Sequence, residues 1–131
     1  EGMKGVITLL NELIDDTKRG DEYLFFPPDV PEKNKEIQQF YLRYDEKRRE
    51  KGIITRGIAP RKLKPLFKRR TYLQMKYTHA SVPVNISICN NKMALISWSE
   101  KPTGVLIHSK QLVYQQKIFF HGLWKSLGDG K

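Results

Sequence analysis

The sequence contains a single cysteine, Cys89, in 131 residues. A lone cysteine excludes an internal disulfide framework and a cysteine metal site, and its place within an apolar stretch predicts a buried, structural thiol. This cysteine usage is typical of a reducing compartment, so we expect a cytoplasmic protein. No apolar run approaches the ~20 residues of a membrane span. The amphipathic N-terminus also differs from a signal peptide, so we expect no membrane partner.

The sequence also lacks the common motifs of catalysis and cofactor binding. It has no glycine-rich phosphate loop, no dinucleotide fingerprint and no serine in a nucleophile elbow. Asp15 and Asp16 fall at the exposed end of an expected helix, which is not the setting of a catalytic carboxylate pair. The three histidines, His79, His108 and His121, lie on different expected elements and lack metal-ligand spacing. We therefore expect no catalytic residue, no metal and no cofactor.

What the chain does have is the composition of a globular domain and a large excess of positive charge. Apolar residues make up 39% and aromatic residues 11% of the sequence, and the formal net charge is +10. The length is that of a single domain with a sizeable core. The charge permits a nucleic acid or another anionic partner, and a solvated, lysine-rich surface is the alternative interpretation.

The hydrophobic pattern predicts an α/β fold with one mixed sheet and helices on both faces. Short or alternating apolar runs between turn residues indicate strands, and apolar residues three or four apart indicate helices. A strand, a helix and a strand of these lengths form a βαβ unit with parallel strands. The expected elements, in chain order, are a helix at 2–19, a strand at 22–26, a helix ending near 51, a strand at 53–58, a short helix at 61–68, a strand at 71–77, a meander of strands at 84–89, 93–99 and 103–107, and a helix at 110–127.

Some local details of these elements also follow from the residues. The second helix is expected to begin at a capping pair, Asp29 and Glu32, with Arg48 on its inward stripe and Asp45 on its charged outer face. The second and third strands of the meander are expected to be buried on both faces. The closing helix is N-capped by Ser109. Its expected apolar face consists of Leu112, Gln116, Phe119, Phe120, Leu123 and Trp124.

The order of these elements and several short sequences resemble a known family. The matching pieces are the glycine-led first helix, Asp-Glu-Tyr-Leu at 21–24, the helix end at 47–53 and the hydrophobic pattern from Val84 to Trp124. Together they resemble the C-terminal effector part of the archaeal sugar-responsive transcription regulators, the TrmB family, over nearly the whole chain. The resemblance implies a phospholipase-D-like α/β domain that is cytoplasmic, dimerises and binds small ligands such as sugars.

In that family the effector part normally follows a winged-helix DNA-binding domain. Residues 1–131 are expected to form one effector-type domain, and no part of them is expected to form a winged helix. DNA would therefore be contacted through a domain outside this chain. The resemblance thus implies the ligand-sensing and dimerisation domain of a transcription regulator.

Active members of the phospholipase D superfamily carry His-x-Lys-x-x-x-x-Asp at the strand that corresponds to 84–89. The histidine attacks phosphorus and the lysine stabilises the phosphoryl oxygens. Two registers are possible here, and they place at the histidine and lysine positions either Pro83 and Asn85, or Val84 and Ile86. Neither register supplies a nucleophile. We therefore expect a catalytically inactive scaffold and no enzyme.

The expected ligand site lies at the carboxyl ends of the parallel strands, where open α/β sheets bind their ligands. Four polar side chains are expected near that edge: Arg56, Arg61, His79 and Asn85. Arg56 or Arg61 would hold an anionic group of the ligand. His79 and Asn85 would hydrogen-bond a polar ligand, which we expect to be a sugar or an anionic metabolite.

A second interpretation is a stand-alone nucleic-acid-binding module that uses the basic segment at 61–70. Its cations would contact phosphates, which makes binding strongly dependent on salt. The simpler explanation of the same segment is a solvated surface helix and turn. The residues that would contact the nucleic acid are Lys62, Lys64, Lys68, Arg69 and Arg70.

A third interpretation is a purely structural domain that holds two copies of the chain together. The closing helix is rich in large apolar side chains, which are common at dimer interfaces. Phe119, Phe120 and Trp124 would then lie partly on the interface of a homodimer.

Overall fold

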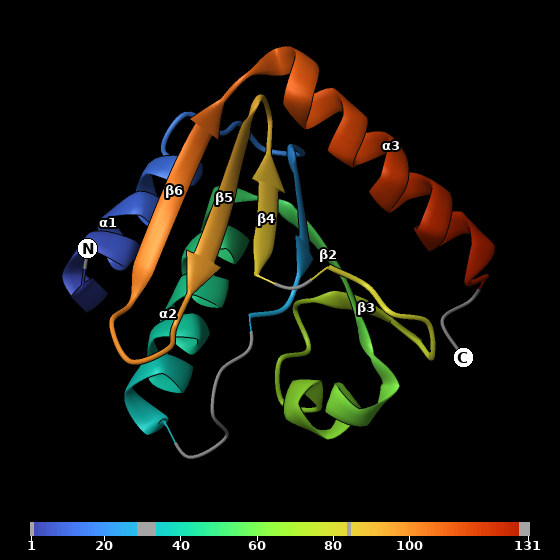
Figure 1. Cartoon of the computed structure of the whole chain (residues 1–131), viewed down its shortest axis with the longest axis horizontal. Coiled ribbons are helices and arrows are strands. Elements are labelled where there is room, and N and C mark those ends of the chain that lie inside the picture. Colours follow the sequence, from blue (N-terminus) through green and yellow to red (C-terminus); the bar gives the residue numbers. More distant parts are fainter. Residues whose placement is uncertain (1, 29–33, 84, 129–131) are drawn as a thin grey trace.

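The structure is a computed structural model that describes residues 2–28, 34–83 and 85–128. Six strands form one sheet in the order β3-β2-β1-β4-β5-β6 (Figure 1). β1, β2 and β3 are parallel, and β4, β5 and β6 continue the sheet as an antiparallel meander. These pairings confirm the α/β class, the βαβ unit and the meander predicted from the sequence. The elements are α1 (Gly2–Leu13), β1 (Glu22–Phe26), α2 (Lys35–Lys51), β2 (Ile54–Pro60), the 3-10 helix η1 (Arg61–Phe67), β3 (Gln74–Thr78), β4 (Ile86–Cys89), β5 (Lys92–Ser97), β6 (Thr103–His108) and α3 (Lys110–Ser126).

Helices cover both faces of the sheet, as predicted. α1 and α2 pack on one face, and α3 crosses the other (Figure 1). Side chains alternate along β1, so Tyr23 and Phe25 join the layer of α1 and α2, whereas Leu24 and Phe26 join the layer of α3. Cys89 is fully buried in the first layer, which confirms its predicted structural place. Among the described residues, the structure has no helix that is long and apolar enough to span a bilayer.

α1 ends at Leu13, well before the predicted end at Arg19. The ammonium group of Lys92, on β5, donates to the carbonyl oxygen of Glu12 at 2.5 Å. This bond satisfies one of the acceptors that the end of a helix leaves open. Asp15 and Asp16 follow. Their negative charges are unfavourable at the C-terminus of a helix, which is the negative end of the helix dipole. The chain therefore turns there towards β1, although the apolar pattern alone extends further.

α2 begins later than predicted, at Lys35. The side-chain oxygen of Asn34 caps it, because this oxygen accepts a hydrogen bond from a backbone N–H of the first turn at 3.0 Å. The capping pair predicted at Asp29 and Glu32 lies outside the described residues. Gly52 ends the helix in the left-handed conformation, with φ of 75°, which glycine adopts without steric cost.

The inner side of α2 brings charge into the core. Arg48 is 2% exposed, which confirms its predicted inward position. Asp45 was predicted on the outer face and is 6% exposed. That prediction was wrong because this carboxylate binds two arginines, Arg48 through one oxygen and Arg70 through both, with Arg70 distances of 2.7 and 2.8 Å. We call Asp45, Arg48 and Arg70 the ion triad.

Aromatic rings and backbone carbonyls surround the ion triad. The guanidinium carbon of Arg48 lies 4.4 Å from the ring centroid of Tyr23 and 4.6 Å from that of Tyr44. The Nε of Arg48 donates to the carbonyl oxygen of Tyr44 at 3.3 Å. The hydroxyl of Tyr44 donates in turn to the carbonyl oxygen of Leu10 in α1, at 2.5 Å. The triad therefore links α2 with β1, with α1 and with the segment before β3.

The expectations for β6 and α3 are only partly met. β6 is an edge strand with Val105 53% exposed, so it is not buried on both faces. On α3, Phe120 is fully buried as predicted, but Leu112 and Phe119 are 51% and 48% exposed. Val113, absent from the predicted face, is buried instead. The reason is the path of α3, which leaves the end of β6 and runs across the sheet away from β5 and β6 (Figure 1).

We expect Asp45→Asn to lower the free energy of unfolding by about 3–5 kcal/mol, the usual cost of removing one partner of a buried ion pair. The variant keeps the side-chain volume but leaves two guanidinium groups without their carboxylate. Urea unfolding followed by circular dichroism measures the change. Glu46→Gln is the matched control, because it breaks another arginine pair of α2, with Arg49, in solvent. Exposed pairs contribute little, so equal losses in both variants would contradict the role of the triad.

Candidate functional site

Three of the four predicted ligand-binding residues lie at the expected edge of the sheet. Arg61 follows the end of β2, and His79 follows the end of β3. Asn85 precedes β4, which is antiparallel to β1, so it lies beside the carboxyl end of β1. Its N–H donates to the carbonyl oxygen of Pro27 at 3.0 Å, and its φ is 64°. Their predicted contact with a ligand stays a prediction.

Arg56 lies elsewhere, towards the amino ends of the strands. It stands opposite Leu24 on β1 and Gln74 on β3. Its guanidinium group forms an ion pair with Glu22, at the start of β1, and its Nε donates to Gln74 Oε1 at 3.2 Å. The structure therefore separates Arg56 from Arg61. The carboxylate of Glu22 already balances the charge of Arg56.

The basic segment at 61–70 divides into exposed and structural cations. Arg70 is largely buried because it belongs to the ion triad. The other cations of the predicted nucleic-acid surface are exposed, and Lys64 Nζ lies 5.6 Å from the ring centroid of Tyr77. Four residues therefore remain available from the five predicted, namely Lys62, Lys64, Lys68 and Arg69.

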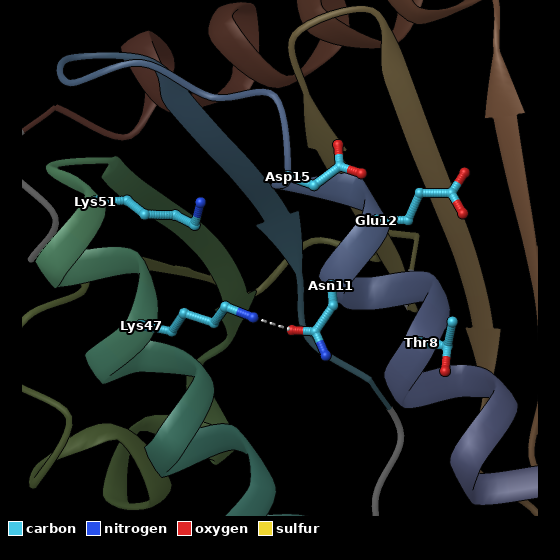
Figure 2. A pocket seen from close by; sticks show the side chains of 6 residues that line it. All are labelled: Thr8, Asn11, Glu12, Asp15, Lys47 and Lys51. Carbon is cyan, nitrogen blue, oxygen red and sulfur yellow. Dashed lines mark hydrogen bonds between the residues drawn. The ribbon is translucent and has the colours of Figure 1, made fainter.

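Two polar cavities lie at the opposite edge of the sheet, near the start of β1. The first is a groove between α1 and α2 with a volume of about 350 Å³, which we call the α1–α2 groove (Figure 2). Its lining residues are Thr8, Asn11, Glu12, Asp15, Lys47 and Lys51. The second cavity, of about 570 Å³, lies at the turn between β4 and β5 and shares Glu12 and Asp15 with the groove. Among the described residues, those that line the two cavities are all polar or charged.

A nearly buried lysine at the start of β5, Lys92, lines the second cavity. Besides the carbonyl of Glu12, Lys92 Nζ contacts Asp15 and Asp16, each at 3.1 Å. Burial alone lowers the pKa of Lys92, but the hydrogen bonds to Asp16 and Asp15 outweigh it and raise that pKa above its usual value. Nearby, the backbone N–H of Lys18 and the side chain of Asn90 lower the pKa of Asp21.

Neither a thiol nucleophile nor a metal centre is found at this edge. Burial raises the pKa of the Cys89 thiol to about 12, so the reactive thiolate is scarce at neutral pH. Within the described ranges 2–28, 34–83 and 85–128, no His, Cys, Asp and Glu side chains are grouped so as to hold a metal ion. The groups at this edge are suited to binding polar ligands through hydrogen bonds and charge.

An exposed apolar surface lies on the other face of the sheet, beside α3. Ile86, Leu95 and Val105 stand opposite one another on β4, β5 and β6, and Leu95 and Val105 are exposed. The ring of Phe119 lies 6.1 Å from that of Phe26 on β1, so this flank of α3 borders the same row. Leu112 and Phe119 are seven residues apart and therefore share that flank. We call Leu95, Val105, Leu112 and Phe119 the apolar corner.

Two of the three side chains expected at a dimer interface are covered within the chain. Phe120 is fully buried. Trp124 is half-buried beneath Lys76, whose Nζ lies 4.4 Å from the ring centroid and donates to the Trp124 carbonyl oxygen at 2.8 Å. Of the three residues, only Phe119 is exposed to a large extent. The sequence did not predict that Leu95 and Val105 are exposed, because both fall in apolar runs that are typical of buried strands.

The arrangement of one mixed six-stranded sheet with helices on both faces has a counterpart among solved structures. The chain superposes on part of TrmBL2, an archaeal chromatin protein whose structure is described as showing a novel mode of DNA binding, with a TM-score of 0.62 and 14% sequence identity. The match covers 95% of this chain and 47% of TrmBL2, so the chain spans about half the length of that protein. No family model matches the sequence, and no curated protein matches it. At this identity the likeness establishes a shared fold.

Proposed function

We propose that this chain is the ligand-sensing and dimerisation domain of a TrmB-like transcription regulator, built on a phospholipase-D-like scaffold. The observation that carries the proposal is the fold, which corresponds over 95% of the chain to part of a DNA-binding archaeal protein. The short sequences that resemble the TrmB effector part support the same conclusion. In this proposal the protein is cytoplasmic, and DNA is contacted by a domain outside residues 1–131.

The scaffold is proposed to be catalytically inactive. At the position of the phospholipase D histidine stands Pro83 in one register and Val84 in the other, and Val84 lies outside the described residues. The backbone of Asn85 is held by hydrogen bonds to Pro27, directly after β1, and to β5, where its carbonyl oxygen accepts from the Ile96 N–H at 3.0 Å. None of these residues is a nucleophile, so the segment supports a structural role and no phosphoryl transfer.

We expect a sugar or an anionic metabolite to stabilise the protein through Arg61, His79 and Asn85. At a ligand concentration about 100 times Kd, binding adds about 2.7 kcal/mol to the stability of the folded state, which raises the Tm by several degrees. A thermal-shift screen of sugars and phosphorylated metabolites detects this rise. Arg61→Gln should abolish it, and Arg43→Gln, an exposed arginine on α2, should not. A flat response across the screen would argue against sensing.

We further propose that two copies of the chain meet at the apolar corner. A net charge of +10 opposes association of two copies through most of their surfaces. The apolar corner, in contrast, consists of four uncharged, exposed side chains, two on the sheet and two on α3. Large exposed apolar patches commonly mark interaction sites. The homodimer therefore buries this surface without bringing like charges together.

We expect Phe119→Glu to convert the dimer into a monomer, because it places a charge within the apolar corner. Light scattering coupled to gel filtration measures the mass. Ile118→Glu is the matched control: Ile118 is also exposed, but it is turned about 100° away from Phe119 around the helix. The control should keep the mass of the wild type. A wild-type monomer, or a dimer that survives Phe119→Glu, would contradict this interface.

A second candidate function is nucleic-acid binding through Lys62, Lys64, Lys68 and Arg69. The observation in its favour is the exposure of four cations within eight residues, 62–69, on a chain of net charge +10. A surface of this kind neutralises phosphates and releases counterions. The pairing of Arg70 with Asp45 removes that residue from the surface.

We expect binding of DNA or RNA to weaken steeply as salt rises, and each lost phosphate contact to reduce the slope of log K against log salt by about 0.9. Fluorescence anisotropy with a labelled duplex measures this slope. The double variant Lys68→Gln and Arg69→Gln should reduce it, whereas Lys4→Gln with Lys110→Gln, two exposed lysines outside the segment, should reduce it less. Undetectable binding at low salt, or equal slopes in both variants, would exclude this function.

A further inference from the structure

Two lysines of the α1–α2 groove have no carboxylate partner among the described residues. Lys47 and Lys51 lie four residues apart on α2, so their side chains are neighbours on one side of the helix. Both extend towards α1 (Figure 2). Lys47 Nζ donates to the neutral amide oxygen of Asn11 at 2.9 Å. The side chain of Lys51 makes no hydrogen bond or ion pair within the described parts of the chain.

The carboxylates that line the groove are engaged elsewhere. Asp15 binds the nearly buried Lys92 at 3.1 Å. Glu12 Oε2 lies 3.5 Å from His108 Nε2, on β6. Figure 2 shows the Glu12 side chain directed away from the two lysines, across α1. The carboxylates and the ammonium groups therefore line one groove, but the carboxylates do not neutralise the ammonium groups.

Two like charges at this spacing destabilise a helix unless something offsets their repulsion. The negative end of the helix dipole favours a cation at Lys51, in the last turn of α2, but this effect falls off within one turn and does not reach Lys47 to the same degree. An anion between the two ammonium groups would remove the repulsion. The Asn11 amide faces Lys47 with its oxygen, and its nitrogen points away from the two lysines (Figure 2).

We propose that the α1–α2 groove binds a small phosphate monoester that also carries hydroxyl groups. Two ammonium groups supply the charged hydrogen-bond donors that bind a phosphoryl group. At the rim, the carboxylate of Asp15 and the hydroxyl of Thr8 accept hydrogen bonds from the hydroxyl groups of the ligand. The volume of about 350 Å³ fits a small metabolite.

The charges around the groove argue for a small ligand instead of a nucleic acid. Glu12 and Asp15 line the same groove, and Asp16 lines the neighbouring cavity; these carboxylates repel the successive phosphates of an extended backbone. A single terminal phosphoryl group reaches the lysines without passing over these carboxylates. The proposal rests on the charges of the groove alone. It is therefore independent of the proposed sensing function, which places its ligand at Arg61, His79 and Asn85.

The test is calorimetric titration of the whole chain with glucose 6-phosphate, glucose, inorganic phosphate and a short DNA duplex. We expect glucose 6-phosphate to bind most tightly, inorganic phosphate more weakly and glucose not measurably. Lys47→Gln and Lys51→Gln should each weaken the binding of glucose 6-phosphate by about tenfold or more, as expected for the loss of a charged hydrogen bond. Lys125→Gln, an exposed lysine on α3, is the matched control and should leave the affinity unchanged.

Each other outcome overturns the proposal in a distinct way. No binding of glucose 6-phosphate at millimolar concentration removes the site. Binding that is unaffected by both groove variants places the ligand elsewhere, and loss of this binding in Arg61→Gln instead would support the sensing edge of the sheet. A duplex that binds more tightly than glucose 6-phosphate, and is lost in the same variants, makes the groove a nucleic-acid surface. Circular dichroism of each variant confirms that it is folded.

Discussion

One carboxylate, that of Asp45, balances two guanidinium groups beneath the sheet, and the placement of several elements depends on it. Arg48 is almost without contact to solvent, where an unpaired charge would cost several kcal/mol. Burial raises the pKa of Tyr23 and of Tyr44, so the phenols that lie against this guanidinium stay neutral and cannot replace the carboxylate. Because Arg70 completes the triad, the segment that carries the exposed cations is held against α2 by the same carboxylate.

This arrangement also explains why the net charge of +10 is a poor guide to the available positive surface. Several cations are committed to partners within the fold: Arg48 and Arg70 share Asp45, Arg56 pairs with Glu22, Lys76 lies on Trp124, and Lys92 binds Asp15, Asp16 and the end of α1. The remaining cations are mostly exposed and solvated. An anion gains most from binding where exposed cations gather without a carboxylate partner among the described residues, at 62–69 and in the α1–α2 groove.

The sequence predicts the parts of this fold that depend on local periodicity. The strands, the βαβ unit, the meander and the Ser109 cap follow from spacing that short segments carry by themselves. Local periodicity does not predict contacts between distant segments. No local pattern indicates that Asp45 pairs with Arg70 or that Arg56 pairs with Glu22. The faces of α3 were missed for a related reason. This helix has apolar residues on nearly all sides, so the pattern does not show which of them the sheet covers. The groove was missed because its lysines lie on α2 and its other residues lie on α1 or directly after it.

The proposed dimer surface and the α1–α2 groove lie on opposite faces of the sheet, and β5 contacts both regions. At one end of β5, Lys92 joins the end of α1 and the carboxylate of Asp15, which lines the groove. Further along, Leu95 belongs to the apolar corner. Contact with the same strand does not by itself couple ligand binding to dimerisation. A ligand shifts the equilibrium between monomer and dimer only if its affinities for the two differ. A ligand at Lys47 and Lys51 meets this condition only where one of its hydroxyl groups donates to Asp15 in competition with Lys92, since that carboxylate is the group the groove and β5 have in common.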